Sequence, residues 1–341
     1  MKPKADGFPE KGVRFFRRIL LGKEKAACNN TEKTAQIAGR VQMLGFIVNP
    51  VSGNGRGLLV WKRLEKELER RRAIFRVKMT TKQGEAKKLA VELLQKEEVS
   101  KIIAVGGDGT VNEVISGMKK ANIPCIFGHI PAGSGNDFAR GHSLPGDPVA
   151  ALEHILSGME GKAIDLFRVN GEIAVNAVGA GFDGEVARVT NEAAYKNWLN
   201  RWRLGRMSYI ISVIRVFLSY RTSRVKLTVD GKETRLEKVW LVAVANIPNY
   251  GGGMLICPKA VPDDGMAEVC VVSNVSKWSL IRAFPMIFNG SHVRHPGVRF
   301  FRGKQIVIEA DRELKVHVDG EVSASTPITV EVEPRSQLIC G

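Results

Sequence analysis

The sequence predicts an α/β protein with an N-terminal Rossmann-like domain, built on a parallel sheet, and a C-terminal antiparallel β-sandwich domain. Up to about residue 163, apolar runs alternate with helical patterns, which favours parallel strands joined by right-handed crossovers. From about Ile164, short strands with alternating apolar residues follow one another with few helices between them. A length of 341 residues also exceeds one typical hydrophobic core, so two domains are expected.

Composition restricts the partners and the compartment. The chain carries 51 Lys and Arg against 35 Asp and Glu, and this net charge of +16 implies an anionic partner, either nucleic acid or an acidic membrane surface. No nucleic-acid-binding pattern is present, which favours the membrane. The five cysteines are scattered without metal-ligand or disulfide spacing, as expected for reduced thiols of a cytoplasmic protein. No apolar run reaches the roughly 18 residues that span a bilayer.

In the first domain, each predicted strand ends in a loop rich in glycine or hydroxyl residues. The strands are expected at Leu44–Val48, Ile74–Met79, Lys101–Val105 and Pro124–Ile130, with helices over Leu58–Arg72 and Glu85 to about Lys96. The carboxyl ends of parallel strands form one edge, and ligands bind beyond that edge. The loops are therefore expected to converge on one binding site.

The central loop is Gly106-Gly107-Asp108-Gly109-Thr110, between an apolar strand and a helical pattern. Glycines let backbone N–H groups approach an anion closely, and a helix N-terminus adds partial positive charge. A carboxylate at Asp108 would repel a bare phosphate, so the loop favours a nucleotide with Mg²⁺. The alternative is a tight turn with an N-cap residue, and the loop alone does not decide between the two.

In the second domain, strands are expected at Ile164–Val169, Glu172–Val178, Val225–Val229, Val239–Ala245, Met266–Val272, Gln305–Glu309 and Leu314–Val318. A helical segment, Glu185–Tyr220, interrupts them. Between Ala193 and Val229 there are eight Lys or Arg residues, no acid, and interleaved aromatics that include Trp198 and Tyr220. This pattern suits a lipid headgroup interface, although a core helix with a basic polar face remains an alternative. A second acid-free segment spans Lys277–Lys304.

Two acidic turns lie near the end of the chain. Asp319-Gly320-Glu321 follows a strand, and taken alone it is a hairpin turn. A phosphoryl-transfer enzyme needs a carboxylate that orients a hydroxyl and accepts its proton, and Asp319 has the most rigid support among the acids of this domain. Asp263-Asp264-Gly265-Met266 is either a cation site or a second hairpin turn.

Taken together and in order, these motifs resemble the bacterial diacylglycerol kinase and lipid kinase family, which is related to sphingosine kinases. The resemblance covers about residue 41 to the end and rests on an ordered set of motifs: Asn49-Pro50-x-Ser52-Gly53, Gly106-Gly107-Asp108-Gly109-Thr110-x-Asn112-Glu113, Gly133-Ser134-x-Asn136-Asp137-Phe138-Ala139-Arg140, Asp264-Gly265 and Asp319-Gly320-Glu321. Ser134 stands where the family often has threonine, a change that keeps the hydroxyl.

The resemblance implies a role for each matching position. The residues that it implies for nucleotide binding are Asn49, Ser52, Gly53, Thr80, Gly106, Gly107, Asp108, Gly109, Thr110, Val111, Asn112, Ser134, Asn136 and Asp137. Asp319 is implied as the general base, with Glu321 beside it and Asp108 near the metal and the phosphates. A structural Mg²⁺ is implied at Val261, Asp264 and Met266, largely through main-chain oxygens.

The expected function is therefore an ATP-dependent and Mg²⁺-dependent lipid kinase, with diacylglycerol as the leading acceptor. A sphingoid, ceramide or other lipid alcohol kinase, an NAD kinase-like enzyme and a non-catalytic lipid or nucleotide sensor are the alternatives. The expected domains are residues 41–163 with about 326–341 for ATP, and residues 164–325 for the lipid. Expected partners are a lipid substrate and the anionic inner face of a membrane, not nucleic acid, and a homodimer stays open. The basic residues 1–40 form either a membrane-lying helix or an unstructured extension.

Overall fold

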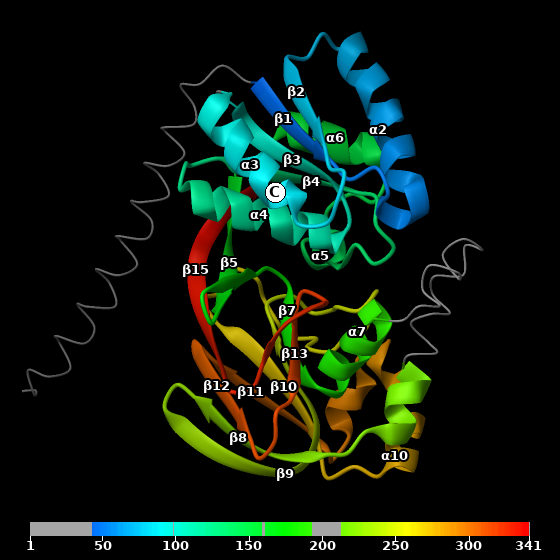
Figure 1. Ribbon diagram of the computed structural model, residues 1–341, viewed down its shortest axis with the longest axis vertical. Helices are drawn as coiled ribbons and strands as arrows, with labels where there is room; N and C mark the ends of the chain where they lie inside the picture. The colour runs from blue at the N-terminus through cyan, green and yellow to red at the C-terminus, as the bar shows by residue number, and fades with distance from the viewer. Residues whose placement is uncertain (1–42, 98, 159–160, 193–212, 341) are drawn as a thin grey trace, which may run out of the picture. The chain divides into compact units, whose positions relative to one another are not determined.

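The computed structural model describes residues 43–97, 99–158, 161–192 and 213–340, all of which belong to one compact unit (Figure 1). The basic extension over residues 1–40 lies outside the described residues. So does the segment 193–212, which holds most of the basic aromatic stretch that the sequence singled out. Every helix in the described ranges is too short or too polar to cross a membrane.

The first half of the unit is built on a parallel sheet with neighbours in the order β4-β3-β1-β2. These strands are β1 (Met43–Val48), β2 (Phe75–Met79), β3 (Val99–Gly106) and β4 (Ile126–Pro131). Almost every residue of β1, β3 and β4 is buried, as expected for strands covered on both faces. This sheet confirms the parallel half of the predicted fold.

Helices pack on both faces of this sheet. They are α2 (Ser52–Arg70), α3 (Glu85–Lys96), α4 (Asp108–Ala121), α5 (Asp137–Gly141) and α6 (Pro148–Ser157). Successive residues of a strand point to opposite faces. Ile47 of β1 accordingly shares a core cluster with residues of α3 and α4, whereas Phe46 contacts the Trp61 ring of α2 at 5.2 Å between centroids. The short helices α5 and α6 were not predicted.

The second half is antiparallel, with neighbours in the order β14-β13-β7-β9-β8-β12-β15, while β10 pairs with β9 and β11, and β5 with β6 and β15. The strands are β5 (Gly161–Val169), β6 (Glu172–Ala174), β7 (Ala177–Gly181), β8 (Ser223–Val229), β9 (Lys232–Ala245), β10 (Ala267–Ser273), β11 (Val298–Gly303), β12 (Gln305–Ala310), β13 (Lys315–Val318), β14 (Glu321–Ser325) and β15 (Ile328–Cys340). A cluster of buried valine, isoleucine and leucine side chains fills the space between them.

Helical segments cover the outside of the β7, β9 and β10 region. They are α7 (Phe182–Glu192), residues 213–219, α10 (Lys277–Ala283), η1 (Phe284–Ile287) and η2 (Ser291–Arg294). Residues from α7, residues 213–219, α10 and η1 share one hydrophobic cluster with these strands, which we call the outer cluster. Its aromatic members include Tyr220, whose ring stacks on Trp240 at 5.6 Å between centroids. Tyr220 is therefore part of the core.

The last strand, β15, connects the two halves. Its first residues pair with β12, and residues 330–333 and 337–340 pair with β5. Near its end it also pairs with β4 of the parallel sheet, through Ile339 and Phe127. Figure 1 shows β15 running from one half to the other. The register with β5 shifts between Glu333 and Gln337. One strand therefore continues from the antiparallel half into the parallel half, and all the strands belong to one sheet.

One predicted strand is wrong. The sequence predicts an unbroken strand over Glu172–Val178, but the structure has β6 and β7 with a break at Val175 and Asn176. The backbone N–H groups of Val175, Asn176 and Ala177 donate to the carboxylate of Asp319, so they cannot continue a regular ladder. Strands β11, β14 and β15 were not predicted.

The contact between α3 and α4 sets the position of the central glycine loop and gives a first test. A Cβ on Gly117 of α4 would lie 2.3 Å from the Lys87 carbonyl oxygen and 2.8 Å from the Ala90 Cβ. We expect Gly117→Ala to lower the free energy of unfolding by about 1–3 kcal/mol in urea titration, because the helices must move apart. Gly146→Ala is the matched control, since a Cβ there meets nothing within 4 Å. Equal losses in the two variants would contradict this packing.

Candidate active site

Three glycine-containing loops meet at the carboxyl edge of the parallel sheet, as the sequence predicts. A Cβ on Gly133 would lie 2.5 Å from the Cα of Gly107, so the loops after β3 and β4 touch through their backbones. A Cβ on Gly53 would lie 2.3 Å from the Ala132 carbonyl oxygen, which brings the loop after β1 to the same point. Side chains larger than hydrogen do not fit at these contacts. The glycines are therefore required for the three loops to meet.

Short polar side chains fix the conformation of these loops. Asn49 donates to the Thr110 hydroxyl at 3.1 Å, and Asn136 accepts from Gly133 N–H at 2.8 Å. The backbone N–H of Phe138, in the first turn of α5, donates to Asp108 Oδ1 at 2.8 Å. Asp108 therefore joins the start of α4 to the start of α5.

The other residues expected at the nucleotide differ in how they are placed. Ser52 lies beside Gly107, and Ser134 is exposed on the loop after β4. Thr80 is buried at the end of β2, and its N–H donates to the Val48 carbonyl. The side chain of Val111 lies in the core. Its N–H donates to the Gly107 carbonyl within α4. Val111 therefore has no polar side-chain group for a ligand, and its N–H already has a partner.

Asp319 lies at the turn between β13 and β14 with a φ of 49°, a conformation that aspartate tolerates better than most residues. Its carboxylate accepts four hydrogen bonds, from Asn112 Nδ2 at 2.6 Å and from the N–H groups of Val175, Asn176 and Ala177 at 2.7, 2.8 and 2.9 Å. Burial raises the pKa of this carboxyl, and the four donors oppose the rise.

Two of the predicted residues bridge the two halves of the unit. The Asn112 side chain, on α4, donates to Asp319 and also to the carbonyl of Ile173, at 2.9 Å. Glu321, on β14, accepts from the Gln83 side chain of the first domain at 2.7 Å, and its Oε1 faces Gly109. The carboxylates at the end of the chain thus contact the segments that carry the glycine loops.

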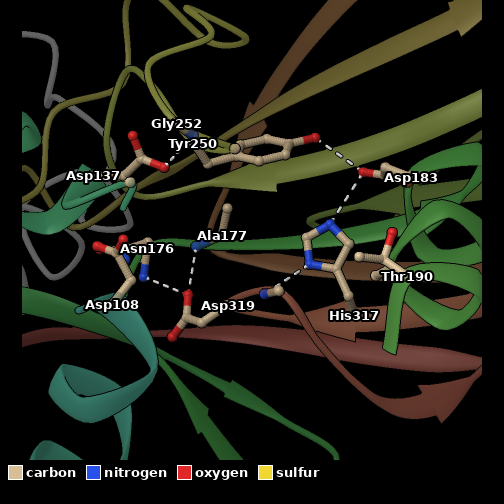
Figure 2. Close-up of a pocket in the computed structure, with 14 residues that line it drawn as sticks. Asp108, Asp137, Asn176, Ala177, Asp183, Thr190, Tyr250, Gly252, His317 and Asp319 are labelled. Carbon is tan, nitrogen blue, oxygen red and sulfur yellow. Dashed lines mark hydrogen bonds and ion pairs between the residues drawn. The ribbon is translucent and has the colours of Figure 1, made fainter. Parts of the chain in front are cut away.

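Asp108 and Asp319 line one cavity of about 280 Å³, although 210 positions separate them in the chain (Figure 2). Asp137 and Gly135 come from the loop after β4, and Asn176 from the break between β6 and β7. The remaining walls come from α7, from the loop with Tyr250 and its glycines, and from the β13–β14 turn. The sequence prediction requires that Asp108 and Asp319 meet in one crevice, and they do.

Asp137 is a further acid of this cavity, and it lies next to Asp108. Asp137 is buried, and its carboxylate accepts from the Gly252 N–H at 2.7 Å and from Arg140 at 2.5 Å. Burial raises the pKa of Asp137, and the nearby charge of Asp108 adds to this effect. An adjacent pair of acids, one with a raised pKa, is typical of functional sites.

A second hydrogen-bond network lies beside the Asp319 turn and also lines the cavity. Asp183 accepts from the Tyr250 hydroxyl at 2.9 Å and faces His317 Nε2 at 3.3 Å, while the Gly320 N–H donates to His317 Nδ1 (Figure 2). Because Nδ1 accepts, a neutral ring carries its proton on Nε2 and donates it to Asp183. Burial and the Asp183 charge raise the pKa of Tyr250, so its hydroxyl remains a donor.

At the turn where a structural metal is expected, the side-chain oxygens of Asp264 already have protein partners. Asp264 Oδ1 accepts from the Met266 N–H, and its other oxygen is paired with Arg302, so a cation would have to displace a guanidinium. Val261 lies in the same turn, and the neighbouring Asp263 pairs with Lys162 at 3.2 Å. No group of three His, Cys, Asp or Glu side chains within the described ranges is arranged around a possible metal position.

A nucleotide-bound Mg²⁺ has different needs, because it keeps waters and phosphate oxygens and uses only one or two carboxylates. Asp108 fits that role, since it lies at the cavity and its second oxygen has no hydrogen-bond partner in the described part of the chain. The residues at the loops therefore fit a metal–phosphate ligand better than a metal held by protein alone.

Comparison with known proteins identifies the family. Residues 43–169 match the diacylglycerol kinase catalytic domain, and residues 176–340 match the YegS C-terminal NAD kinase beta sandwich-like domain. A crystal structure titled "putative diacylglycerol kinase" from Bacillus anthracis is similar, with a TM-score of 0.71 and 27% identity over 89% of this chain and 97% of its own. "Putative lipid kinase YtlR" of Bacillus subtilis is 28% identical over 85% of this chain and 96% of the relative.

A diacylglycerol kinase of Mycobacterium tuberculosis is 32% identical over 239 residues, which cover 68% of this chain and 74% of the relative. The chain belongs to the diacylglycerol kinase family. The predicted resemblance and the predicted fold class are thereby confirmed, and the protein is a kinase. For this kinase, the cavity between the glycine loops and the Asp319 turn is the candidate active site.

Sequence reasoning missed several residues of this site: Gln83, Asn176, Asp183, Tyr250 and His317. A signal exists for His317, because it stands two positions before Asp319, near the end of the strand that leads into the turn. Another exists for Tyr250, which is followed by three glycines, as expected for a loop that a ligand approaches. Gln83, Asn176 and Asp183 have no local signal, since tertiary contacts alone bring them to the site.

The contact between Asn112 and Asp319 is testable with a pair of variants. Both Asn112→Ala and Asn112→Asp remove the donated hydrogen bond, but only the second adds a carboxylate beside Asp319. At neutral pH we expect the free energy of unfolding of Asn112→Asp to be about 1–2 kcal/mol lower than that of Asn112→Ala, because two carboxylates then share a site. The difference should shrink at mildly acidic pH, where the pair holds one proton and the new carboxyl donates it. Urea unfolding at the two pH values measures this, and a pH-independent difference would contradict the assigned contact.

Proposed function

We propose that this kinase transfers the γ-phosphoryl group of ATP to the hydroxyl of a membrane lipid, with diacylglycerol as acceptor and phosphatidic acid as product. The observation that carries the proposal is the shared cavity of Asp108 and Asp319, which joins the glycine loops to an acidic turn of the second half. The relatives named diacylglycerol kinase in Mycobacterium tuberculosis and Bacillus subtilis support the choice of acceptor.

The glycine loops supply the nucleotide side. Backbone N–H groups at the start of α4 and along the loop after β4 would bind the phosphates, helped by the helix dipole. Asn49 and Thr110 hold these loops in place through their hydrogen bond. Mg²⁺ would be held by Asp108 together with the phosphates, where it neutralises phosphate charge.

Asp319 supplies the acceptor side. A carboxylate has about four acceptor positions, and all four are filled by hydrogen bonds. To take a proton from a substrate hydroxyl, Asp319 has to exchange one donor. Asn112 is the only side chain among the four donors and comes from the other half of the unit, so a lipid hydroxyl replaces this donor at least cost. The pKa of the Asp319 carboxyl is raised by burial, which brings it closer to the working pH, where a general base is most effective.

The cavity is smaller than a lipid with two acyl chains. A volume of about 280 Å³ holds only the end of such a lipid that carries the hydroxyl, so the acyl chains have to extend beyond the cavity. Binding of this kind suits an enzyme that takes its acceptor from a bilayer. We therefore propose a peripheral location at the inner face of the membrane.

The reaction is tested by transfer of labelled γ-phosphate to diacylglycerol in mixed micelles. Asp108→Asn keeps the acceptor for the Phe138 N–H and removes only the charge, so we expect wild-type thermal stability and a loss of transfer of about hundredfold or more. Asp319→Asn should lose activity to a similar extent and also stability, because its new NH₂ group faces N–H donors. Transfer to NAD in place of lipid, or an active Asp108→Asn protein, would overturn the proposal.

A panel of lipid alcohols decides the acceptor. Diacylglycerol, ceramide and sphingosine are presented in the same micelles, and kcat/KM is compared among them. We expect diacylglycerol to be preferred. A preference for ceramide or sphingosine would keep the kinase and replace the acceptor.

A further inference from the structure

The helix α10 and the 3-10 turn η1 contain no buried residue, which is unusual for apolar segments of a folded domain. Trp278 is 75% exposed, Phe288 is 54% exposed and Ile281 is 48% exposed. The rings of Phe284 and Phe288 contact each other at 5.9 Å between centroids, on the outside of the protein. Leu280 and Ile287 point the other way and pack on the outer cluster.

The helical residues 213–219 extend this surface. Ile214 and Leu218 are 54% and 69% exposed, and Lys277 of α10 donates to the Leu218 carbonyl at 2.7 Å. We call the exposed side chains of Ile214, Leu218, Trp278, Ile281, Phe284 and Phe288 the α10 surface. Contiguous exposed apolar side chains of this kind mark an interaction site.

The charge around the α10 surface is positive. From Lys277 to Lys304 the chain has no Asp or Glu. Within the described residues, Arg282 and Arg294 have no carboxylate partner, and Arg215 adds a further cation beside Leu218. Apolar side chains with surrounding cations are complementary to an anionic bilayer, which accepts the apolar groups and attracts the cations. Nucleic acid would leave the aliphatic side chains in water.

Backbone contacts connect the α10 surface to the active-site cavity. The Leu255 N–H donates to the Ile287 carbonyl at 3.0 Å, and His292 contacts the Ile256 carbonyl at 3.1 Å. These residues continue the loop that carries Tyr250, Gly251 and Gly252 into the cavity wall. Val186 of α7 belongs to the same outer cluster as Leu280 and Ile287.

We propose that the α10 surface is the face by which this protein docks on an anionic phospholipid bilayer. Trp278, Ile281 and Phe288 enter the headgroup boundary, and Arg282 and Arg294 contact lipid phosphates. The proposal rests on the proposed function in one respect, because a lipid acceptor gives the docking its purpose.

Docking is measured by co-sedimentation of the full chain with vesicles of phosphatidylcholine and phosphatidylglycerol in equal amounts, and with phosphatidylcholine alone. We expect the double variant Trp278→Ser and Ile281→Ser to bind both vesicles about tenfold or more weakly, because two apolar groups no longer leave water. Arg282→Glu should lose about tenfold on the anionic vesicles and little on phosphatidylcholine.

Matched controls lie away from this face. Leu59→Ser removes an exposed leucine of α2, and Lys232→Glu reverses an exposed lysine at the β8–β9 turn. Both should bind vesicles like the wild type. Wild-type binding by the α10 variants, or equal losses in the controls, would overturn the proposal.

Quenching of tryptophan fluorescence by brominated lipids tests the docking geometry with a variant that still binds vesicles. Trp278→Phe keeps an aromatic side chain and should bind anionic vesicles like the wild type. If Trp278 enters the bilayer, brominated lipids quench part of the wild-type fluorescence, and this part is lost in Trp278→Phe. An identical quenched fraction in the two proteins would place Trp278 outside the membrane and reject the docking geometry.

Activity separates this proposal from the proposed function. On a short-chain diacylglycerol in detergent micelles, the α10 variants should keep wild-type rates, whereas on diacylglycerol in anionic vesicles they should fall with binding. If the wild type phosphorylates no lipid but docks through α10, the proposed function fails and the docking face stands. If the α10 variants change only the oligomeric state in light scattering, the face is an interface between two copies, and the membrane proposal fails.

Discussion

The carboxylate of Asp319 organises the junction between the two halves of this kinase. Asp319 accepts from the side chain of Asn112, on a helix of the first half, and from three successive backbone N–H groups at the break between β6 and β7. Without it, those N–H groups would lose their partners in a partly buried position, at a cost of about 1–3 kcal/mol for each one left unpaired. The same interaction ends β6, starts β7 and fixes the turn between β13 and β14. The candidate active site follows from this arrangement, because each of these segments supplies part of its wall.

The cavity is acidic although the chain is strongly basic. Asp108, Asp137, Asp183 and Asp319 line one volume in a protein with a net charge of +16. A bare anion would be repelled by these side chains. In the proposed reaction, phosphate binding therefore depends on the backbone N–H groups of the glycine loops and on a cation that accompanies the ligand. Burial raises the pKa of Asp137 and Asp319, which lowers the repulsion at acidic pH. The surplus of positive charge lies elsewhere, and part of it surrounds α10.

Much of the fold could be predicted because buried parallel strands are recognisable as apolar runs, and α3 was predicted at its observed bounds, Glu85–Lys96. The meeting of the glycine loops followed from a topological rule and needed no contact information. The break at Val175 could not be predicted, since its cause is a carboxylate more than 140 positions away in the chain. Tyr220 illustrates the same difficulty. Its place among cations favours a membrane interface over a core helix, and the stacking on Trp240 assigns that residue to the core instead.

The α10 surface and the cavity are supported by one hydrophobic cluster and one loop, so events at the two places are not independent. If a bilayer orders η1, the hydrogen bond from Leu255 to Ile287 passes that order to the loop with Tyr250 and its glycines. Linkage then requires the reverse effect as well, since a ligand that orders this loop in the cavity strengthens docking by the same free energy. Three consecutive glycines with positive φ, Gly251 to Gly253, form the turn of this loop, and the Gly252 N–H contacts Asp137 in the cavity. No residue of the α10 surface lines the cavity itself, so in the proposed docking a bilayer acts on the site through this loop and through the shared cluster.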